Sequence, residues 1–123
     1  MKRYFVIGFI GWLVATILVR IGGQFLLHPE SALSIVLLFA VSFAVMVWMT
    51  RAICGAAKLA REQWPTAGVM LILPALLLDP FTTAFFAQVF PNVEASAAGL
   101  FGGWIIISTA GALIGANSGN SRI

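Results

Sequence analysis

The chain has few of the side chains from which catalytic and metal sites are built. It contains one cysteine and one histidine among 123 residues, and only 9% of its residues are charged. A single cysteine excludes an internal disulfide, and a single histidine leaves no cluster for a zinc site. Nucleophile-elbow, phosphate-loop, HExxH and paired-carboxylate patterns are absent as well. We therefore expect no metal and no cofactor, and we do not expect an enzyme.

A basic surface for nucleic acid is missing too, because the seven basic residues are dispersed and do not alternate with exposed aromatic residues. Hydrophobic residues instead make up 61% of the chain, and its mean hydropathy is +1.04. A water-soluble domain cannot bury that much apolar surface, whereas the length suits about four membrane-spanning helices of roughly 20 residues each. The sequence therefore predicts an all-α, polytopic membrane protein, with a single domain over residues 1–123 that forms a compact four-helix bundle in the lipid bilayer.

Four apolar segments predict the spans: residues 4–27, 32–50, 66–90 and 95–116. The first follows a basic start, as in a signal peptide, but no A-x-A-like cleavage site follows and Arg20 interrupts it, which favours a retained helix. Ser31 is placed to cap the second helix. Six basic residues fall on one side of the four spans: Lys2, Arg3, Arg51, Lys58, Arg61 and Arg122. The opposite loops carry only His28, Glu30 and Glu94, so we expect both termini in the cytoplasm.

Two ionisable residues, Arg20 and Asp79, lie inside the predicted spans. Each costs roughly 2.5–3.5 kcal/mol near the centre of a membrane helix, so each needs a physical reason to be there. Counted from the helix starts, they lie about 24 and 20 Å from the basic side, and an ion pair between them is the cheapest way to house both charges. Four polar neighbours are expected to support this pair: Thr16, Gln24, Thr82 and Thr83.

Two roles for Arg20 and Asp79 remain open at this point. The first is structural: the long side chain of Arg20 extends to the outer headgroups, and Asp79 pairs with it or caps a half-helix. The second is functional, with Asp79 binding a transported ion, a proton or a ligand.

The backbone around Asp79 is unusual because Pro74 and Pro80 lie in the same predicted span. Each proline removes an N–H donor and leaves a carbonyl one turn earlier without its helical partner. The sequence therefore predicts a third helix that is kinked or broken at Asp79-Pro80. A re-entrant hairpin is the alternative, but it would place Arg122 outside and contradict the charge pattern.

Small residues recur at four-residue spacing along one face of the fourth span: Ala95, Gly99, Gly103, Gly111 and Gly115. Such a stripe lets another helix approach closely, and close packing drives helix association in lipid. The helix that packs there belongs either to the same bundle, to a second copy of the chain, or to a larger membrane protein.

Three segments of the sequence resemble a known family: "LPALLLDPFTTAFFAQVFPN" (73–92), "GLFGGW" (99–104) and "LVRIGGQFLLHP" (18–29). On these segments the chain resembles the uncharacterised small bacterial membrane proteins grouped as domain-of-unknown-function family 5367. The resemblance implies a bacterial inner-membrane protein with four spans. It carries no activity with it.

Two classes of function are consistent with these features. The favoured one is an accessory, structural or regulatory subunit that packs through the glycines of the fourth span. The alternative is an oligomeric carrier or channel component, in which Asp79 with Arg20 binds an ion or a proton. An intramembrane enzyme is disfavoured because acid–base chemistry needs partner groups that this inventory lacks.

Overall fold

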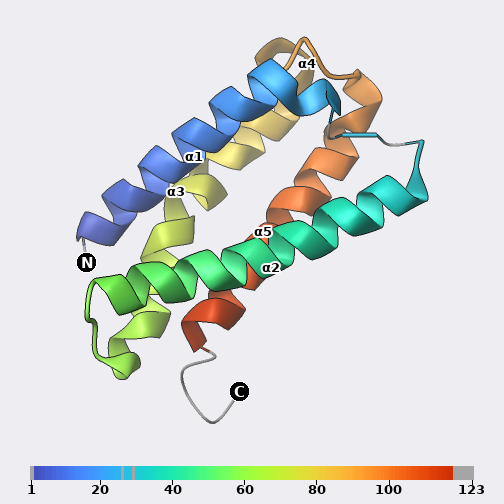
Figure 1. Cartoon of the computed structure of the whole chain (residues 1–123). Coiled ribbons are helices and arrows are strands. Elements are labelled where there is room, and N and C mark those ends of the chain that lie inside the picture. The colour runs from blue at the N-terminus through green and yellow to red at the C-terminus, as the bar shows by residue number, and fades with distance from the viewer. Residues whose placement is uncertain (1, 26, 29, 118–123) are drawn as a thin grey trace.

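The computed structural model describes residues 2–25, 27–28 and 30–117 (Figure 1). Four long helices make up most of it: α1 (Lys2–Gly22), α2 (Ala32–Ala56), α3 (Trp64–Ala84) and α5 (Ala98–Asn117). Shorter elements join them: the 3₁₀ turns η1 (Gly23–Phe25), η2 (Arg61–Gln63) and η3 (Ala95–Ala97), and the one-turn helix α4 (Phe86–Val89). No described residue lies in a strand, so the predicted all-α fold is confirmed.

Each long helix is long and apolar enough to cross a membrane. With their adjoining 3₁₀ turns the four candidate spans have 23 to 25 residues. At 1.5 Å per residue they reach about 35 Å or more, against a hydrocarbon core of about 30 Å. Large apolar side chains cover the outer surface, with Leu33 69% and Ile106 71% exposed. Because such a surface suits lipid and not water, the chain is a membrane protein.

The four long helices pack as two pairs. α1 lies along α3 and α2 lies along α5, while α3 and α5 contact each other and join the pairs (Figure 1). α1 and α2 are neighbours in sequence, yet they have little contact. α3 and α5 are therefore the central helices, and each has neighbours on two sides.

The α2–α5 interface depends on glycine. A β-carbon built on Gly111 would lie 2.7 Å from the carbonyl oxygen of Phe43, and one built on Gly115 would lie 2.6 Å from that of Val47. Gly103 also faces α2, through a phenylalanine ring. Three glycines of the predicted stripe therefore pack inside the bundle, which is one of the alternatives that the sequence left open.

The fourth glycine, Gly99, is exposed, and nothing lies within 4 Å of its β-carbon position. Glycine also serves the other two interfaces. Gly8 of α1 lies directly against the backbone of Leu71 in α3, and Gly68 of α3 lies against Ala116 of α5. All three helix interfaces thus contain a glycine at which a β-carbon would collide with the neighbouring helix.

α3 remains one α-helix through both Pro74 and Pro80. Of the two predicted forms, a break at Asp79-Pro80 is therefore wrong, and the same continuity excludes the re-entrant hairpin. The helix ends later, at Phe85, where the backbone leaves the helical region (φ −107°, ψ 36°). Neighbouring helices on both sides hold the segment in place, which is how membrane helices tolerate proline.

The chain leaves the helix at Phe85 because the next residues pack inward. The rings of Phe86 and Phe90 lie 5.4 and 5.0 Å from that of Phe101 on α5. These rings form the centre of a buried cluster at the α4 end of the bundle: Val19, Leu27, Phe86, Phe90, Val93, Ala97 and Phe101. A second cluster closes the opposite end: Tyr4, Cys54, Trp64 and Ala67.

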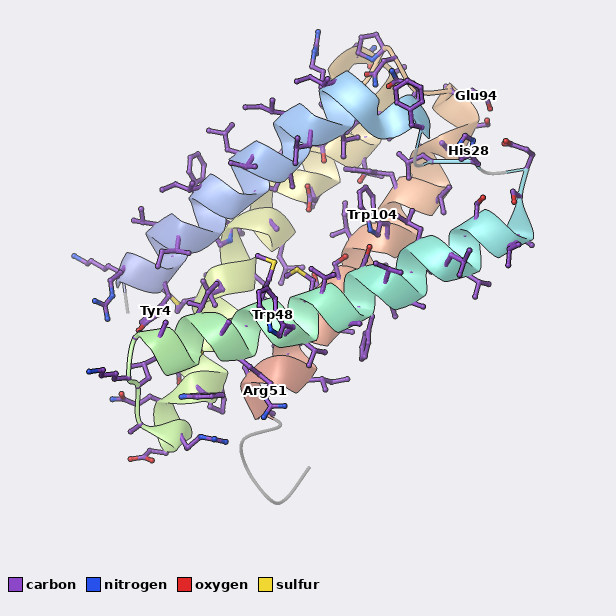
Figure 2. All side chains as sticks on the ribbon, in the orientation of Figure 1. Tyr4, His28, Trp48, Arg51, Glu94 and Trp104 are labelled. Carbon is purple, nitrogen blue, oxygen red and sulfur yellow. The ribbon has the colours of Figure 1, made fainter. Side chains whose placement is uncertain are left out.

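The two ends of the bundle differ in charge. Figure 2 shows Tyr4 and Arg51 toward one end, and His28 and Glu94 at the other. The N-terminus of α1, the C-terminus of α2 and the start of α3 bring five of the predicted basic residues to the first end: Lys2, Arg3, Arg51, Lys58 and Arg61. We call it the basic end. The sixth, Arg122, lies outside the described residues.

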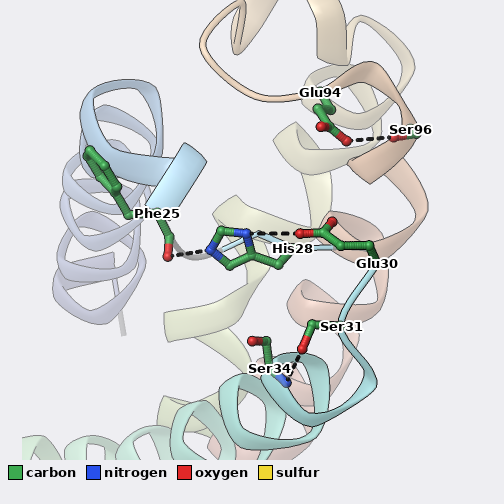
Figure 3. Close-up of polar contacts among 7 residues, drawn as sticks. All are labelled: Phe25, His28, Glu30, Ser31, Ser34, Glu94 and Ser96. Atoms are coloured by element: carbon green, nitrogen blue, oxygen red, sulfur yellow. Dashed lines mark hydrogen bonds and ion pairs between the residues drawn. The ribbon is translucent and has the colours of Figure 1, made fainter.

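The start of α2 follows the sequence-based expectation. Ser31 accepts a hydrogen bond from the backbone N–H of Ser34 at 3.2 Å and caps the helix (Figure 3). At its other end α2 continues to Ala56, beyond the predicted limit at residue 50. The chain then turns at Lys58, which has a positive φ of 56°.

Candidate functional site

Asp79 is buried on α3, with 8% of its surface exposed. The indole Nε1 of Trp12 on α1 donates a hydrogen bond to its Oδ1 at 2.8 Å. The hydroxyl of Thr82 lies 3.2 Å from the same Oδ1 and 3.0 Å from the Asp79 backbone carbonyl, so it shares its one hydrogen between them. Within the described part of the chain, two neutral donors and no cation therefore hold this carboxyl.

Asp79 also borders a groove between α3 and α5 with a volume of about 420 Å³. Asp79 and Thr83 are the two polar side chains of its lining, and the remaining residues are apolar: Leu76, Pro80, Ala84, Gly102, Ile105 and Ile106. Among the described residues none donates a hydrogen bond to the second carboxyl oxygen, Oδ2. Because Pro80 has no N–H, the carbonyl of Leu76 lacks its helical donor as well. A buried carboxyl group, a threonine and a residue without a helical donor for its carbonyl thus line one groove.

The predicted ion pair between Arg20 and Asp79 is not formed. Arg20 is exposed, and its Nη1 donates to the carbonyl of Val89 at 2.8 Å. That carbonyl belongs to the C-terminal end of α4, where a cation is favourable. The side chain of Arg20 therefore extends toward the α4 end of the bundle.

The register of α1 against α3 explains why Arg20 and Asp79 do not form an ion pair. Gly8 lies against Leu71, so Asp79, eight residues beyond Leu71, comes level with Thr16. Arg20 is one turn farther out, about 6 Å along the axis. From there its side chain turns away from Asp79. The indole of Trp12 reaches the carboxyl from the turn below.

The polar residues that were expected to form one network belong to two groups. Thr82 bonds to Asp79 and Thr83 lines the same groove, as described above. Gln24 lies at the α4 end of the bundle, where it donates to the carbonyl of Ile21 and accepts from Asn92 at 2.6 Å. No described residue hydrogen-bonds the side chain of Thr16, so it does not support Asp79 directly.

Asn92 was missed by the sequence-based reasoning. Its amide nitrogen donates to Gln24 and also to the carbonyl of Val19 at 3.0 Å, which ties the loop after α4 to α1. Together with the bond between Arg20 and Val89, these contacts hold the C-terminal end of α1 against α4 and the loop that follows it. These hydrogen bonds join α1 to α4 and the following loop, so we assign them a structural role.

Two tryptophans inside the spans, Trp12 and Trp104, have polar partners on neighbouring helices. Trp12 donates to Asp79, and the indole of Trp104 on α5 donates to the Ser42 hydroxyl on α2 at 2.6 Å. Figure 2 shows Trp104 between the helices. The signal was available in the sequence, because an indole N–H in the hydrocarbon region needs an acceptor.

The remaining polar groups do not make a metal site. Within the described part of the chain, no three His, Cys, Asp or Glu side chains are close enough to hold a metal ion. His28 is in the turn before α2, where Nε2 donates to the carbonyl of Phe25 at 2.9 Å and Nδ1 lies 3.4 Å from Glu30 (Figure 3). These local contacts stabilise the turn.

Four apolar spans, glycine-based interfaces and one buried carboxyl define the class of this molecule, a small multi-span membrane protein. The chain belongs to a family of unknown function (DUF5367), whose sequence model matches residues 26–119. The resemblance noted from the sequence is thereby confirmed. No curated protein and no solved structure matches the chain significantly. The matched range contains Asp79 and Thr82, whereas Trp12 and Arg20 precede it.

Proposed function

We propose that this protein is a subunit of an oligomeric carrier or channel in the bacterial inner membrane, in which Asp79 binds a proton or a small cation. One observation carries the proposal. Among the described residues the Asp79 carboxyl has no cationic partner and its Oδ2 accepts no hydrogen bond, while the residue borders an open groove. An ionisable group in a membrane span is costly, and such groups mark ion and proton pathways.

The lining of the groove supports a cation. Small hard cations and protons bind to carboxyl, hydroxyl and carbonyl oxygens. Asp79 and Thr83, which carry a carboxyl and a hydroxyl group, both line the groove from α3. The bond from Trp12 leaves Oδ2 available, because it engages only Oδ1.

The proposal requires an oligomer. The groove is open toward the surrounding lipid, and one small bundle has little room for an aqueous pathway. A second copy, or a larger membrane protein, is needed to cover the groove and complete a path. Exposed apolar side chains on both flanking helices, Leu76 of α3 and Ile106 of α5, are suited to that contact.

The orientation and the absence of catalysis are parts of the same proposal. The five described basic residues at one end favour a cytoplasmic location for that end and for both termini. Among the described residues that line the groove, Asp79 is the only ionisable one. Acid–base or metal chemistry needs partner groups, so we propose a non-enzymatic role.

The accessory-subunit hypothesis has less support than it had from the sequence. It rested on the glycine stripe, and Gly103, Gly111 and Gly115 pack against α2 of the same chain. Of that stripe only Ala95 and Gly99, both exposed, are left to receive a partner. We therefore place the carrier or channel role first.

Reconstitution tests the proposal. Purified protein is placed in liposomes that contain a pH-sensitive dye, and proton, Na⁺ and K⁺ fluxes are followed after a gradient is imposed. We expect Asp79→Asn to reduce flux at least tenfold, because the amide still accepts from Trp12 but cannot exchange a proton or neutralise a cation. Glu94→Gln is the matched control, since it removes an exposed carboxylate outside the groove. Equal flux in both variants, or wild-type flux no greater than in empty liposomes, would contradict the proposal.

A further inference from the structure

A second groove lies at the basic end of the bundle, between α2 and the start of α3. It has a volume of about 440 Å³ and is lined by Ala44, Val47, Trp48, Arg51, Ala52 and Trp64. The five α2 residues follow helical spacing, so they form one face that extends about 12 Å along the axis. Figure 2 shows Trp48 and Arg51 on this part of α2.

The face changes in polarity along the helix. Ala44 and Val47 lie toward the middle of the membrane, and Arg51 lies five residues before the end of α2, about 8 Å from it. Between them Trp48 is 69% exposed, which is typical of an indole at the headgroup level. The groove is therefore apolar at its deep end and cationic near the membrane surface.

The cation in this groove has hydrogen-bonding capacity to spare. A guanidinium carries five N–H donors, and no described residue supplies an acceptor or an ion-pair partner to Arg51. None of the lining residues is acidic. The local charge thus favours an anion.

We propose that this groove binds one anionic phospholipid, with an acyl chain along Ala44 and Val47 and the phosphate on the guanidinium of Arg51. The proposal is independent of the role proposed for Asp79. An amphiphile fits the change in polarity, whereas a free anion gains nothing from the apolar lining. A second copy docked through the same face by a twofold axis would bring two Arg51 side chains together, which is unfavourable. Basic pockets beside membrane helices recognise lipid headgroups by this chemistry.

The test compares lipid affinities by native mass spectrometry of the purified protein in detergent, titrated with phosphatidylglycerol or phosphatidylcholine of the same chains. We expect phosphatidylglycerol to bind about fivefold more tightly, the factor typical of one basic side chain near a membrane surface. Arg51→Gln should abolish that preference. Lys2→Gln, which removes an exposed charge from the same end outside the groove, should preserve it.

A second variant tests whether lipid binding depends on the shape of the groove as well as on its charge. Ala52→Leu fills the lining at an exposed position without changing any charge, so it should weaken phosphatidylglycerol binding at least fivefold. Equal binding of the two lipids overturns the proposal. So do equal losses in Arg51→Gln and Lys2→Gln, or unchanged binding in Ala52→Leu. A lipid-independent dimer that Ala52→Leu abolishes would assign the groove to a second copy instead.

Discussion

The two helix pairs of this bundle are held together by different kinds of contact. α2 and α5 approach through Gly111 and Gly115, and the polar side-chain link between them is the bond from Trp104 to the Ser42 hydroxyl. α1 and α3 also approach through a glycine, but the polar link between them ends on the carboxyl of Asp79. One pair thus carries an ionisable acceptor, and the other carries a neutral one.

The difference between the two acceptors distinguishes what helix packing requires from what a function requires. Close backbone contact and a neutral hydrogen bond are sufficient to join two helices in lipid, as α2 and α5 demonstrate. The α1–α3 pair would need no more than that for stability. A carboxyl in the same position therefore exceeds what packing requires, which is why we connect Asp79 with a function.

The largest effect is expected from a substitution that prevents the close contact between α2 and α5. Gly111→Ala adds a β-carbon 2.7 Å from the Phe43 carbonyl oxygen, so the helices must separate. We expect a loss of about 1–3 kcal/mol in the free energy of unfolding. The measurement is denaturation in mixed micelles followed by circular dichroism.

Gly99→Ala is the matched control for this prediction, because nothing lies within 4 Å of its β-carbon position. A change below about 0.5 kcal/mol is expected there. If both substitutions had the same effect, the glycines of α5 would not owe their importance to contact with α2.

A smaller effect should distinguish the two tryptophan bonds. Trp12→Phe and Trp104→Phe remove the same atoms from the two helix pairs, but only Trp12 donates to a carboxyl. Hydrogen bonds to charged groups contribute about 1.5–3 kcal/mol and neutral ones about 0.5–1.5 kcal/mol. We therefore expect Trp12→Phe to be more destabilising by about 1 kcal/mol in the same unfolding assay. Equal losses would mean that Asp79 acts as an ordinary neutral acceptor.

Much of the fold could be predicted because it depends on local sequence. Hydropathy and length determine the four spans in lipid, and Ser31 caps α2 through a contact three residues away. The stripe containing Gly111 and Gly115 was visible from spacing alone. Which helix packs on that stripe was not predictable, because the choice between α2 and another protein depends on tertiary arrangement.

The candidate site was predicted less well, because it depends on register and side-chain direction. Asp79 was identified by its cost in the membrane, but its partner was taken to be Arg20 from helix depth alone. The depths of Arg20 and Asp79 agree to about one turn, but the Arg20 side chain is directed toward Val89. The partner of Asp79 is therefore Trp12. The end of α3 at Phe85 was likewise set by aromatic packing farther along the chain and not by proline.

The smallest expected effect is an absence of coupling between the two ionisable residues of the spans. Arg20→Gln, Asp79→Asn and the double variant form a cycle that measures their interaction free energy. Because Arg20 bonds to Val89 and Asp79 to Trp12, the two changes should add to within about 0.5 kcal/mol. A cycle of Trp12→Phe with Asp79→Leu is the positive control and should show clear coupling. Coupling above about 1 kcal/mol between Arg20 and Asp79 would restore the ion pair and place the polar link of α1 and α3 one turn farther out.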